Sequence, residues 1–532
     1  MPSETADVLA ARYGTALRWY ATGTAMLGMV AAMVTTTIVN VAIPDIMGAF
    51  GIGQDRAQWL STGALAAMTV AMLTTSWLIN RLGERRLFIG ALIVFTATSL
   101  VAGFSPNENV LIAARVVQGS VAGILQPLSM YVLFRVFPPE SRGTAMGMFG
   151  MSVLIGPALG PTIGGLLIDH FNWRYIFFVN VPLACAAMLL GMLFMPERGE
   201  NAKRPSFDWL GFVLLATTIA TLLTGLSNGR REGWNSDFVI SLFAIATLSG
   251  IGFLAWELHV KQPLVELRVL AVGQFTAAAS VAFIFGLGMF GSVYLVPLFV
   301  QTVQKYTPLD AGLLLMPAGL IMGAVMPIAG YISDRVPART MIICGLLCFA
   351  ISSYWMSIVD RNTSFWTLAW LVVASRIGLA LIKPALNLSA LRPLPQDLLS
   401  HGAGMINFAR QLGAAFGVNS LSMMLDLRTM FHSSSLTSTQ SAGNSATAEL
   451  LTQTKALLAQ AGLAADVQNA AALNYLGKVV YAQASTLGFR DSFLICGVIF
   501  TVALIPAWIM GMERAAVARR ARTAAAPAAA SR

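Results

Sequence analysis

Long stretches of apolar residues recur along the whole chain, and short polar breaks separate them. Many stretches exceed the about 18 residues at which an apolar run predicts a transmembrane helix. Apolar and polar residues do not alternate in the segments of about 10 residues that are typical of a membrane β-barrel. The pattern therefore predicts an all-α integral membrane protein with about 14 transmembrane helices. The expected spans are residues 19–43, 58–79, 87–104, 110–133, 144–168, 175–195, 209–228, 238–257, 275–300, 309–332, 340–358, 365–390, 403–425 and 490–511.

The composition agrees with this class. Of 532 residues, 56% are hydrophobic and 11% are charged, whereas a soluble domain carries about 25% charged residues. The net charge of +10 would suggest nucleic acid on a soluble protein, but no basic run is long enough to follow a phosphate backbone. With the N-terminus placed in the cytoplasm, the cytoplasmic segments hold about twice as many Lys and Arg as the outer loops. We therefore expect no nucleic-acid partner and two cytoplasmic termini.

The two halves of the chain repeat each other weakly. Residues 76–86, after the second span, resemble residues 330–339, after the tenth. Residues 141–149 resemble residues 400–408, and Gln126-Pro127 corresponds to Lys383-Pro384. Two six-helix halves of the same topology are typical of a transporter that binds its substrate between them. The expected organisation is an N-terminal half (1–200), two inserted helices (201–270), a C-terminal half (271–514) and a cytoplasmic tail (515–532).

Only one predicted loop is long, at residues 426–489. Loops of this length are seldom without function, and residues 446–473 have the pattern of an amphipathic helix. Two interpretations remain open, a solvated insertion and a docking site for a periplasmic partner. The tail alternates Ala and Arg, which suggests contact with anionic lipid headgroups.

Several stretches of the chain carry short motifs: 36–44 in span 1, residues 115–119 with the pattern R-x-x-Q-G, and 173–182. Two loops are similar to the pattern G-x-x-x-D-R-x-G-R-[RK], and span 5 is rich in Gly and Pro. The residues are Asn80, Arg81, Gly83 and Arg86 in the first loop, Gly330, Asp334, Arg335 and Arg339 in the second, and Gly156, Pro157, Gly160, Pro161, Gly164 and Gly165 in span 5. These motifs resemble those of the fourteen-span drug:proton antiporters of the major facilitator superfamily, and most closely its EmrB-type multidrug efflux pumps, with span 5 similar to the antiporter motif.

The resemblance implies export of amphiphilic drugs or toxic compounds by proton antiport, through alternating access and without a cofactor. It implies a place in a bacterial inner membrane, and as partners the substrate, protons, membrane lipid, a periplasmic membrane-fusion adaptor and an outer-membrane channel. Two positions depart from the family pattern. Thr35 stands where the family has an Asp in span 1, which weakens the case for proton coupling. In the first loop, Ser76 replaces Gly and Asn80 replaces Asp, so only the second loop keeps the acid that helps hold the halves together.

Arg115 is a charge within span 4. A charge in the bilayer costs roughly 3 kcal/mol or more, so it should face the bundle or water. The motif favours a role in proton-coupled gating, with Gln118 one turn on and with Thr35 and Asn40 nearby. The alternative is a packing arginine bonded to backbone carbonyls and Asn40.

Three further cations fall inside spans. Arg376 and Lys383 are two turns apart and share a face of span 12, while Arg410 lies in span 13. If they line the cavity with Gln126, they favour anionic substrates, and a Lys383 left neutral by burial could carry the coupling proton. The alternative is that Lys383 and Arg410 extend to the cytoplasmic interface.

Two other functions compete with export. An uptake or exchange carrier for a small metabolite anion could use the same fold. A membrane enzyme is not expected, because the sequence holds no catalytic triad pattern, metal cluster or phosphate-binding loop. The four cysteines, Cys185, Cys344, Cys348 and Cys496, are interpreted as small core residues.

Overall fold

The computed structural model describes residues 11–197, 206–441 and 443–510. These residues form helices and no strands, which confirms the all-α class. Twelve helices are long and apolar enough to cross a membrane. With α6 (Arg142–His170) and α15 (Leu399–Ser438), the described part of the chain has the fourteen spans expected. The predicted tail lies outside the described residues.

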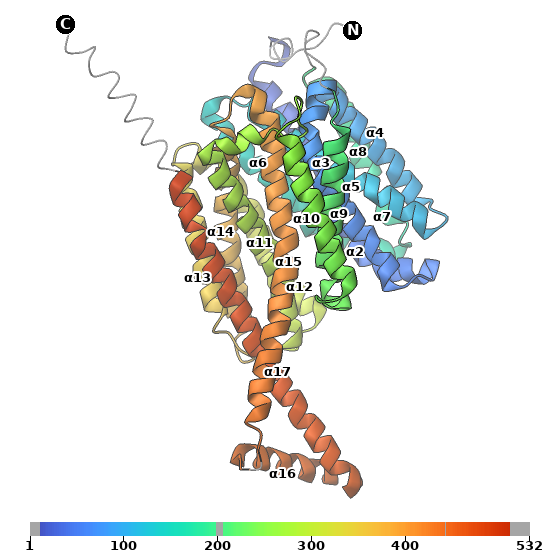
Figure 1. The fold of residues 1–532 in the computed structure, drawn as a ribbon, viewed down its shortest axis with the longest axis vertical. Helices are drawn as coiled ribbons and strands as arrows, with labels where there is room; N and C mark the ends of the chain where they lie inside the picture. Colours follow the sequence, from blue (N-terminus) through green and yellow to red (C-terminus); the bar gives the residue numbers. More distant parts are fainter. Residues whose placement is uncertain (1–10, 198–205, 442, 511–532) are drawn as a thin grey trace, which may run out of the picture.

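The N-terminal half contains six spans. They are α2 (Leu17–Phe50), α3 (Gln54–Leu82), α4 (Glu84–Gly103), α5 (Glu108–Val136), α6, and α8 (Val181–Phe194), which the short α7 (Tyr175–Phe178) precedes. Of these, α4, α5 and α8 lie on the right of Figure 1. Tyr175–Phe194 together form the span predicted at 175–195, with a two-residue turn at Val179 and Asn180. Pro182 occupies the first turn of α8, where a proline is well tolerated because the N–H it lacks has no helical partner.

Two inserted helices separate the halves in sequence. α9 (Trp209–Glu232) and α10 (Asp237–Glu257) form an antiparallel hairpin, and α9 packs on α3 and α15. Asp208 accepts a hydrogen bond from the N–H of Gly211, and Ser236 accepts one from Val239. These N-caps fix where each helix begins. The hairpin thus touches both halves from one side.

The C-terminal half repeats the six-span pattern. Its helices are α11 (Gly273–Thr302), α12 (Pro308–Ser333), α13 (Ala338–Met356), α14 (Phe365–Leu391), α15 and α17 (Ala465–Val502), with α16 (Ser445–Gln460) between the last two.

The predicted loop at residues 426–489, here called the arm, is largely helical. α15 continues to Ser438, α17 begins at Ala465, and Gly462, at a φ of +82°, follows α16. The helix expected at 446–473 is thus divided between α16 and α17. A positive φ cannot continue a right-handed helix, and glycine adopts it readily. Figure 1 shows both long helices leaving the bundle, with α16 at their far end, opposite the start of α2.

The arm is joined at its base by one acid. The carboxylate of Asp491 on α17 accepts hydrogen bonds from Arg428 Nε at 2.6 Å and from His432 Nε2 at 2.7 Å, both on α15. A carboxylate shared by two donors fixes the relative position of two helices better than a single contact does. α15 and α17 therefore enter the arm as a connected pair.

The halves pack closely where α6 meets α12. A Cβ added at Gly147 would lie 2.6 Å from the carbonyl oxygen of Met326, and one at Gly330 would lie 2.6 Å from that of Gly143. Only glycine permits backbones to approach this closely, as at other helix contacts in membranes. α3 and α15 form a second contact between the halves.

Candidate functional site

Four cationic side chains are buried inside the bundle. Arg115 is 2% exposed, Lys383 3%, Arg376 6% and Arg410 9%. Within the described residues, none of the four forms an ion pair, and each is held by neutral oxygen atoms. These positions therefore carry positive charge without a counter-ion, which is costly inside a bilayer. The interpretation that Lys383 and Arg410 extend to the interface is wrong, since both are enclosed.

Arg115 connects four helices of the N-terminal half. Its guanidinium donates to the carbonyl oxygens of Thr35 on α2, at 3.2 Å, and Leu60 on α3, at 3.3 Å. It also donates to Gln118 Oε1 at 3.0 Å, and Gln118 Nε2 donates to Ser99 on α4. The planar guanidinium can reach several acceptors at once, which an ammonium group does less well.

Thr35 has a polar partner of its own. Its hydroxyl accepts a hydrogen bond from Asn180 Nδ2 at 2.7 Å and donates to the carbonyl of Ala31. The predicted contact between Asn40 and Arg115 is wrong, because Asn40 is exposed and accepts from Ser61 at 2.7 Å instead. The family's acidic position is thus filled by a neutral Thr–Asn pair, and Arg115 binds the backbone carbonyl of the same Thr35.

Lys383 crosses from one half to the other. Its Nζ on α14 donates to the carbonyl of Gly150 on α6 at 3.3 Å and lies 5.8 Å from the centre of the Phe149 ring. A Cβ added at Gly150 would lie 3.6 Å from Lys383 Cδ. The ammonium therefore rests on backbone and an aromatic face, at the boundary between the two halves.

Arg410 lies near Lys383 on the neighbouring helix α15, and the two charges repel each other. Arg410 Nη2 donates to Asn407 Oδ1 at 3.0 Å, and Asn407 Nδ2 lies 3.2 Å from the sulfur of Met130 on α5. Two buried basic groups on neighbouring helices, with no carboxylate partner among the described residues, form a site that favours an anion. Asn407 adds a second polar contact between the halves.

Arg376 has a different environment, although it shares a helix face with Lys383. Its Nη1 donates to Ser292 on α11 at 2.9 Å, within the C-terminal half. The two cations on α14 therefore serve different contacts.

Two buried amides near this centre have unused polar atoms. Gln126 on α5 is 1% exposed and Asn387, one turn after Lys383 on α14, is 7% exposed. In the described structure, Gln126 Oε1 and Asn387 Nδ2 have no hydrogen-bond partner. Buried polar atoms are rarely left unpaired without a reason. They offer a free acceptor on α5 and a free donor on α14, the donor lying one turn from Lys383.

The second signature loop joins the halves through Asp334. Asp334 Oδ1 accepts from the N–H of Gly143 at 2.5 Å, and Oδ2 accepts from the N–H and hydroxyl of Thr144 at 2.9 and 2.7 Å. Both donors lie in the first turn of α6, where free N–H groups attract an anion. Gly330 packs on α6 one turn earlier. Arg335 and Arg339 lie over the rings of Tyr331 and Trp508.

The first signature loop makes a weaker contact. In the described residues, Asn80 shows no bond across the halves, and Ser76 Oγ instead meets Ser400 Oγ at 2.8 Å. Arg81 lies over the ring of Trp77. Gly83, at a φ of +80°, precedes α4, and Arg86 binds Glu197 at 3.0 Å. The two pseudo-repeated loops thus differ in chemistry, a carboxylate on helix N–H groups in one and a hydroxyl pair in the other.

The antiporter-like motif packs α6 on α2. A Cβ added at Gly156 would lie 2.5 Å from Met33, and one at Gly160 2.2 Å from the hydroxyl of Thr37. Gly164 approaches Ile38 similarly, whereas Gly165 has open space. The side chains of Pro157 and Pro161 lie outside the described part of the structure. The motif therefore joins helices within one half.

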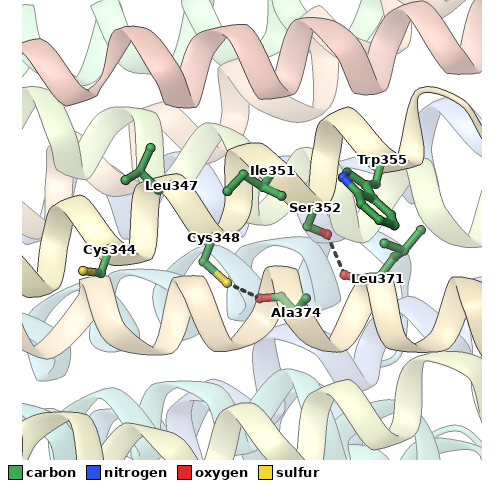
Figure 2. A pocket seen from close by; sticks show the side chains of 8 residues that line it. All are labelled: Cys344, Leu347, Cys348, Ile351, Ser352, Trp355, Leu371 and Ala374. Atoms are coloured by element: carbon green, nitrogen blue, oxygen red, sulfur yellow. Dashed lines mark hydrogen bonds between the residues drawn. The ribbon is translucent and has the colours of Figure 1, made fainter.

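An apolar groove of about 460 Å³ runs between α13 and α14 (Figure 2). Its polar atoms are satisfied, because Cys348 Sγ donates to the carbonyl of Ala374 and Ser352 Oγ to that of Leu371. None of its lining residues is a predicted site residue. Cys344 is exposed in this groove and only Cys496 is fully buried, so the interpretation of all four cysteines as core residues is wrong.

Comparison with known proteins identifies the family. Residues 25–418 match the profile of the Major Facilitator Superfamily. The chain belongs to the major facilitator superfamily. The fold is also similar to a solved proton:xylose symporter, XylE, with a TM-score of 0.60 and 13% identity over 93% of this chain and 96% of that one. It resembles the human organic anion transporter MFSD10 with a TM-score of 0.58 and 13% identity, covering 91% of this chain and 99% of that one.

Relatives within the superfamily cover most of the chain. The multidrug export protein EmrB of Escherichia coli K12 is 31% identical over 76% of this chain and 79% of its own. EmrB of Haemophilus influenzae is 30% identical over 89% of this chain and 92% of its own. The fatty acid resistance protein FarB of Neisseria gonorrhoeae is 28% identical over 93% and 96%. The chain is thus a multi-pass membrane transporter and not an enzyme.

Sequence reasoning missed several neutral members of these sites. Asn180, Asn387, Asn407 and Ser292 each contact or adjoin a predicted residue. A single polar residue inside an apolar stretch was a signal for the three asparagines. No sequence signal distinguishes Ser292 from the many other hydroxyl residues of the spans.

Proposed function

We propose that this superfamily member exports amphiphilic compounds by proton antiport from a bacterial inner membrane, with both termini in the cytoplasm. The observation that carries the proposal is its similarity, over most of both chains, to proteins named for multidrug export and fatty acid resistance. An uptake carrier for a metabolite anion is not favoured, because these relatives are named for export and resistance.

The arrangement of the polar contacts supports alternating access. The contacts of Asp334 and of Ser76 with the opposite half lie at the helix ends, whereas Lys383 and Asn407 contact the opposite half deeper in the bundle. To open the end of the bundle that carries the signature loops, three hydrogen bonds to the carboxylate of Asp334 must break. Each is worth about 1.5–3 kcal/mol where a charged group takes part. A substrate anion near Lys383 and Arg410 would offset the repulsion between them and so favour one state.

Transport in sealed vesicles tests the function. Inverted membrane vesicles carrying the protein should accumulate a fluorescent amphiphile when the lumen is acidic, and a protonophore should stop the uptake. Vesicles from cells with the empty vector are the control. Uptake that is indifferent to the proton gradient would contradict proton antiport.

Asp334→Asn should slow transport by about tenfold, which corresponds to about 1.4 kcal/mol, because an amide holds the N–H groups of Gly143 and Thr144 less well than a carboxylate. Asn80→Ala, the matched change in the first loop, should alter the rate little, since Asn80 shows no bond across the halves in the described structure. Initial rates in vesicles at equal protein content provide the measurement. Equal losses of transport rate in both variants would show that the two loops contribute equally to the contact between the halves.

The arm is the proposed docking element for a membrane-fusion adaptor that leads to an outer-membrane channel. Its helices expose large apolar side chains, among them Leu457, Leu473 and Tyr481. Exposed apolar side chains grouped outside the bilayer indicate a contact surface.

Replacing residues 439–464 with a short Gly/Ser linker should leave vesicle transport nearly unchanged but should abolish resistance in intact cells. The deletion removes α16 and spares the Asp491 contact at the base of the arm, so the bundle should fold. Resistance assays and vesicle rates are measured on the same variant. Full resistance of intact cells would exclude the arm as the docking element.

A further inference from the structure

Two carboxylates lie buried together at the base of the inserted hairpin. Asp208, which precedes α9, is 8% exposed, and Glu257, the last residue of α10, is 5% exposed. A Cβ built on Gly211 would lie 2.2 Å from Asp208 Oδ2 and 3.2 Å from Glu257 Oε1. Both acids therefore converge on the same small space above the first turn of α9.

The hydrogen bonds of the pair use only one oxygen of each acid. Asp208 Oδ1 accepts from the N–H of Gly211 at 2.9 Å and from the indole of Trp256 at 2.8 Å. Glu257 Oε1 accepts from the N–H of Val265 at 3.3 Å. Asp208 Oδ2 and Glu257 Oε2 are buried and have no partner among the described residues.

We propose that Asp208 and Glu257 share one proton, which makes the base of the inserted hairpin a proton-binding site that controls its grip on the two halves. Two ionised carboxylates in one buried space repel each other, and neighbouring acids avoid this by holding a proton between them. A proton shared by the two acids makes one of them a hydrogen-bond donor to the other, which no described residue is to their unpartnered oxygens. The inference is independent of the direction and substrate of transport.

Among the residues that the structure describes, no salt bridge joins a cation to Asp208 or to Glu257. On the linker that follows α10, His259 and Lys261 are exposed and Glu266 binds Arg268 at 3.4 Å. On α3, Arg81 is exposed and lies over the ring of Trp77. Glu266 places a further acidic group near Glu257.

The remaining titratable neighbour is His401 on α15, just before the predicted span at 403–425. Burial lowers the pKa of His401 to about 4, so its ring is neutral in the physiological range. Neutral His401 accepts the N–H of Glu266 through Nδ1 at 3.5 Å. His401 therefore supplies no positive charge to the acid pair in that range.

Hydrogen bonds connect this site to both halves. On one side, the indole of Trp77 on α3 donates to the carbonyl of Ser206 at 3.0 Å, two residues before Asp208. On the other, Val265 is bonded to Glu257, and the adjacent Glu266 is bonded to His401. Trp77 and His401 directly follow Ser76 and Ser400, whose hydroxyls meet across the halves. If the pair lost its shared proton, Asp208 and Glu257 would repel each other. That repulsion would strain the segments next to them, which are bonded to Trp77 and His401 beside the Ser76–Ser400 contact.

Infrared spectroscopy of the full chain in lipid nanodiscs tests the proton site without transport. We expect a protonated-carboxyl band that disappears as the pH rises, and that is absent in Glu257→Gln and in Asp208→Asn. Both amides can donate the hydrogen bond that the shared proton supplies, so both variants should fold, and each tests the site by itself. Glu266→Gln, which changes a neighbouring acid, should keep the band. A band that persists in either variant, or no pH-dependent band in the unaltered chain, would overturn the assignment.

The grip on the halves is measured by cross-linking. In a background without the native cysteines, Ser76→Cys with Ser400→Cys should form a disulfide more slowly at alkaline than at acid pH, after correction for the thiolate fraction with a matched cysteine pair elsewhere. Adding Glu257→Gln should remove that difference. A pH difference that survives in Glu257→Gln would separate the proton site from the contact between the halves.

Discussion

Replacing Arg115 with alanine is expected to reduce transport at least about a hundredfold, or about 2.7 kcal/mol in barrier height. The guanidinium is bonded to α2, to α3 and, through Gln118, to α4. An alanine leaves these groups unpaired in a buried site, which costs about 1–3 kcal/mol for each orphaned group. The measurement is the initial rate of uptake by inverted vesicles at equal protein content.

Two further variants interpret this result. Arg115→Lys keeps the charge but reaches fewer acceptors, so an intermediate rate would assign part of the effect to geometry. Arg56→Ala removes an exposed arginine from α3 and should transport normally. If Arg115→Ala is well folded and transports at the normal rate, Arg115 is only a packing residue.

The second large effect concerns substrate charge. Lys383→Ala should reduce the protection of a pump-deficient strain against amphiphilic weak acids by about tenfold, and should affect neutral dyes less. Lys383 and Arg410 lie close together without a carboxylate partner in the described structure, so removing one charge weakens the attraction for an anion. The measurement is a resistance panel of weak acids, neutral dyes and lipophilic cations of matched hydrophobicity.

Lys478→Ala is the matched control for this panel, because Lys478 is exposed on the arm. Arg376→Ala should have a smaller effect than Lys383→Ala, since Arg376 is bonded within one half to Ser292. Protection against cations alone, unchanged in Lys383→Ala, would contradict a preference for acids.

The sequence predicted the class of the molecule well, because the thickness of a bilayer sets the length of each apolar stretch. A span requires about 20 apolar residues whatever its neighbours are, so the number of spans followed from the apolar pattern alone. The arm was misjudged for the same reason. α15 and α17 continue beyond the bilayer with polar residues, and a search for long apolar stretches does not detect such extensions.

The candidate site was harder to predict, because it depends on contacts between distant helices. The enclosure of Arg115 followed from a charge within an apolar stretch, whereas for Lys383 an extension to the interface stayed open until the structure showed it buried. The sequence did not predict the backbone partners of either residue one by one. Lys383 binds a backbone carbonyl of Gly150, and a carbonyl leaves no trace in a sequence. Similarly, Asn40 could be assigned to α2 but not to the face of α2 that contacts Ser61 rather than Arg115.

Because α15 is continuous, a tilt of its inner part moves the arm as well. One uninterrupted helix of 40 residues, about 60 Å long, carries Asn407 and Arg410 near one end and the arm at the other. The Asp491 contact ties α17 to it, so a tilt of α15 carries both helices. Each degree of tilt about the inner end displaces the far end by about 1 Å. A tilt of a few degrees, which is a small movement near Lys383, thus displaces the far end of the arm by several ångströms. A pair of probes, one on α16 and one on the hairpin between α9 and α10, would measure that displacement as a change in distance.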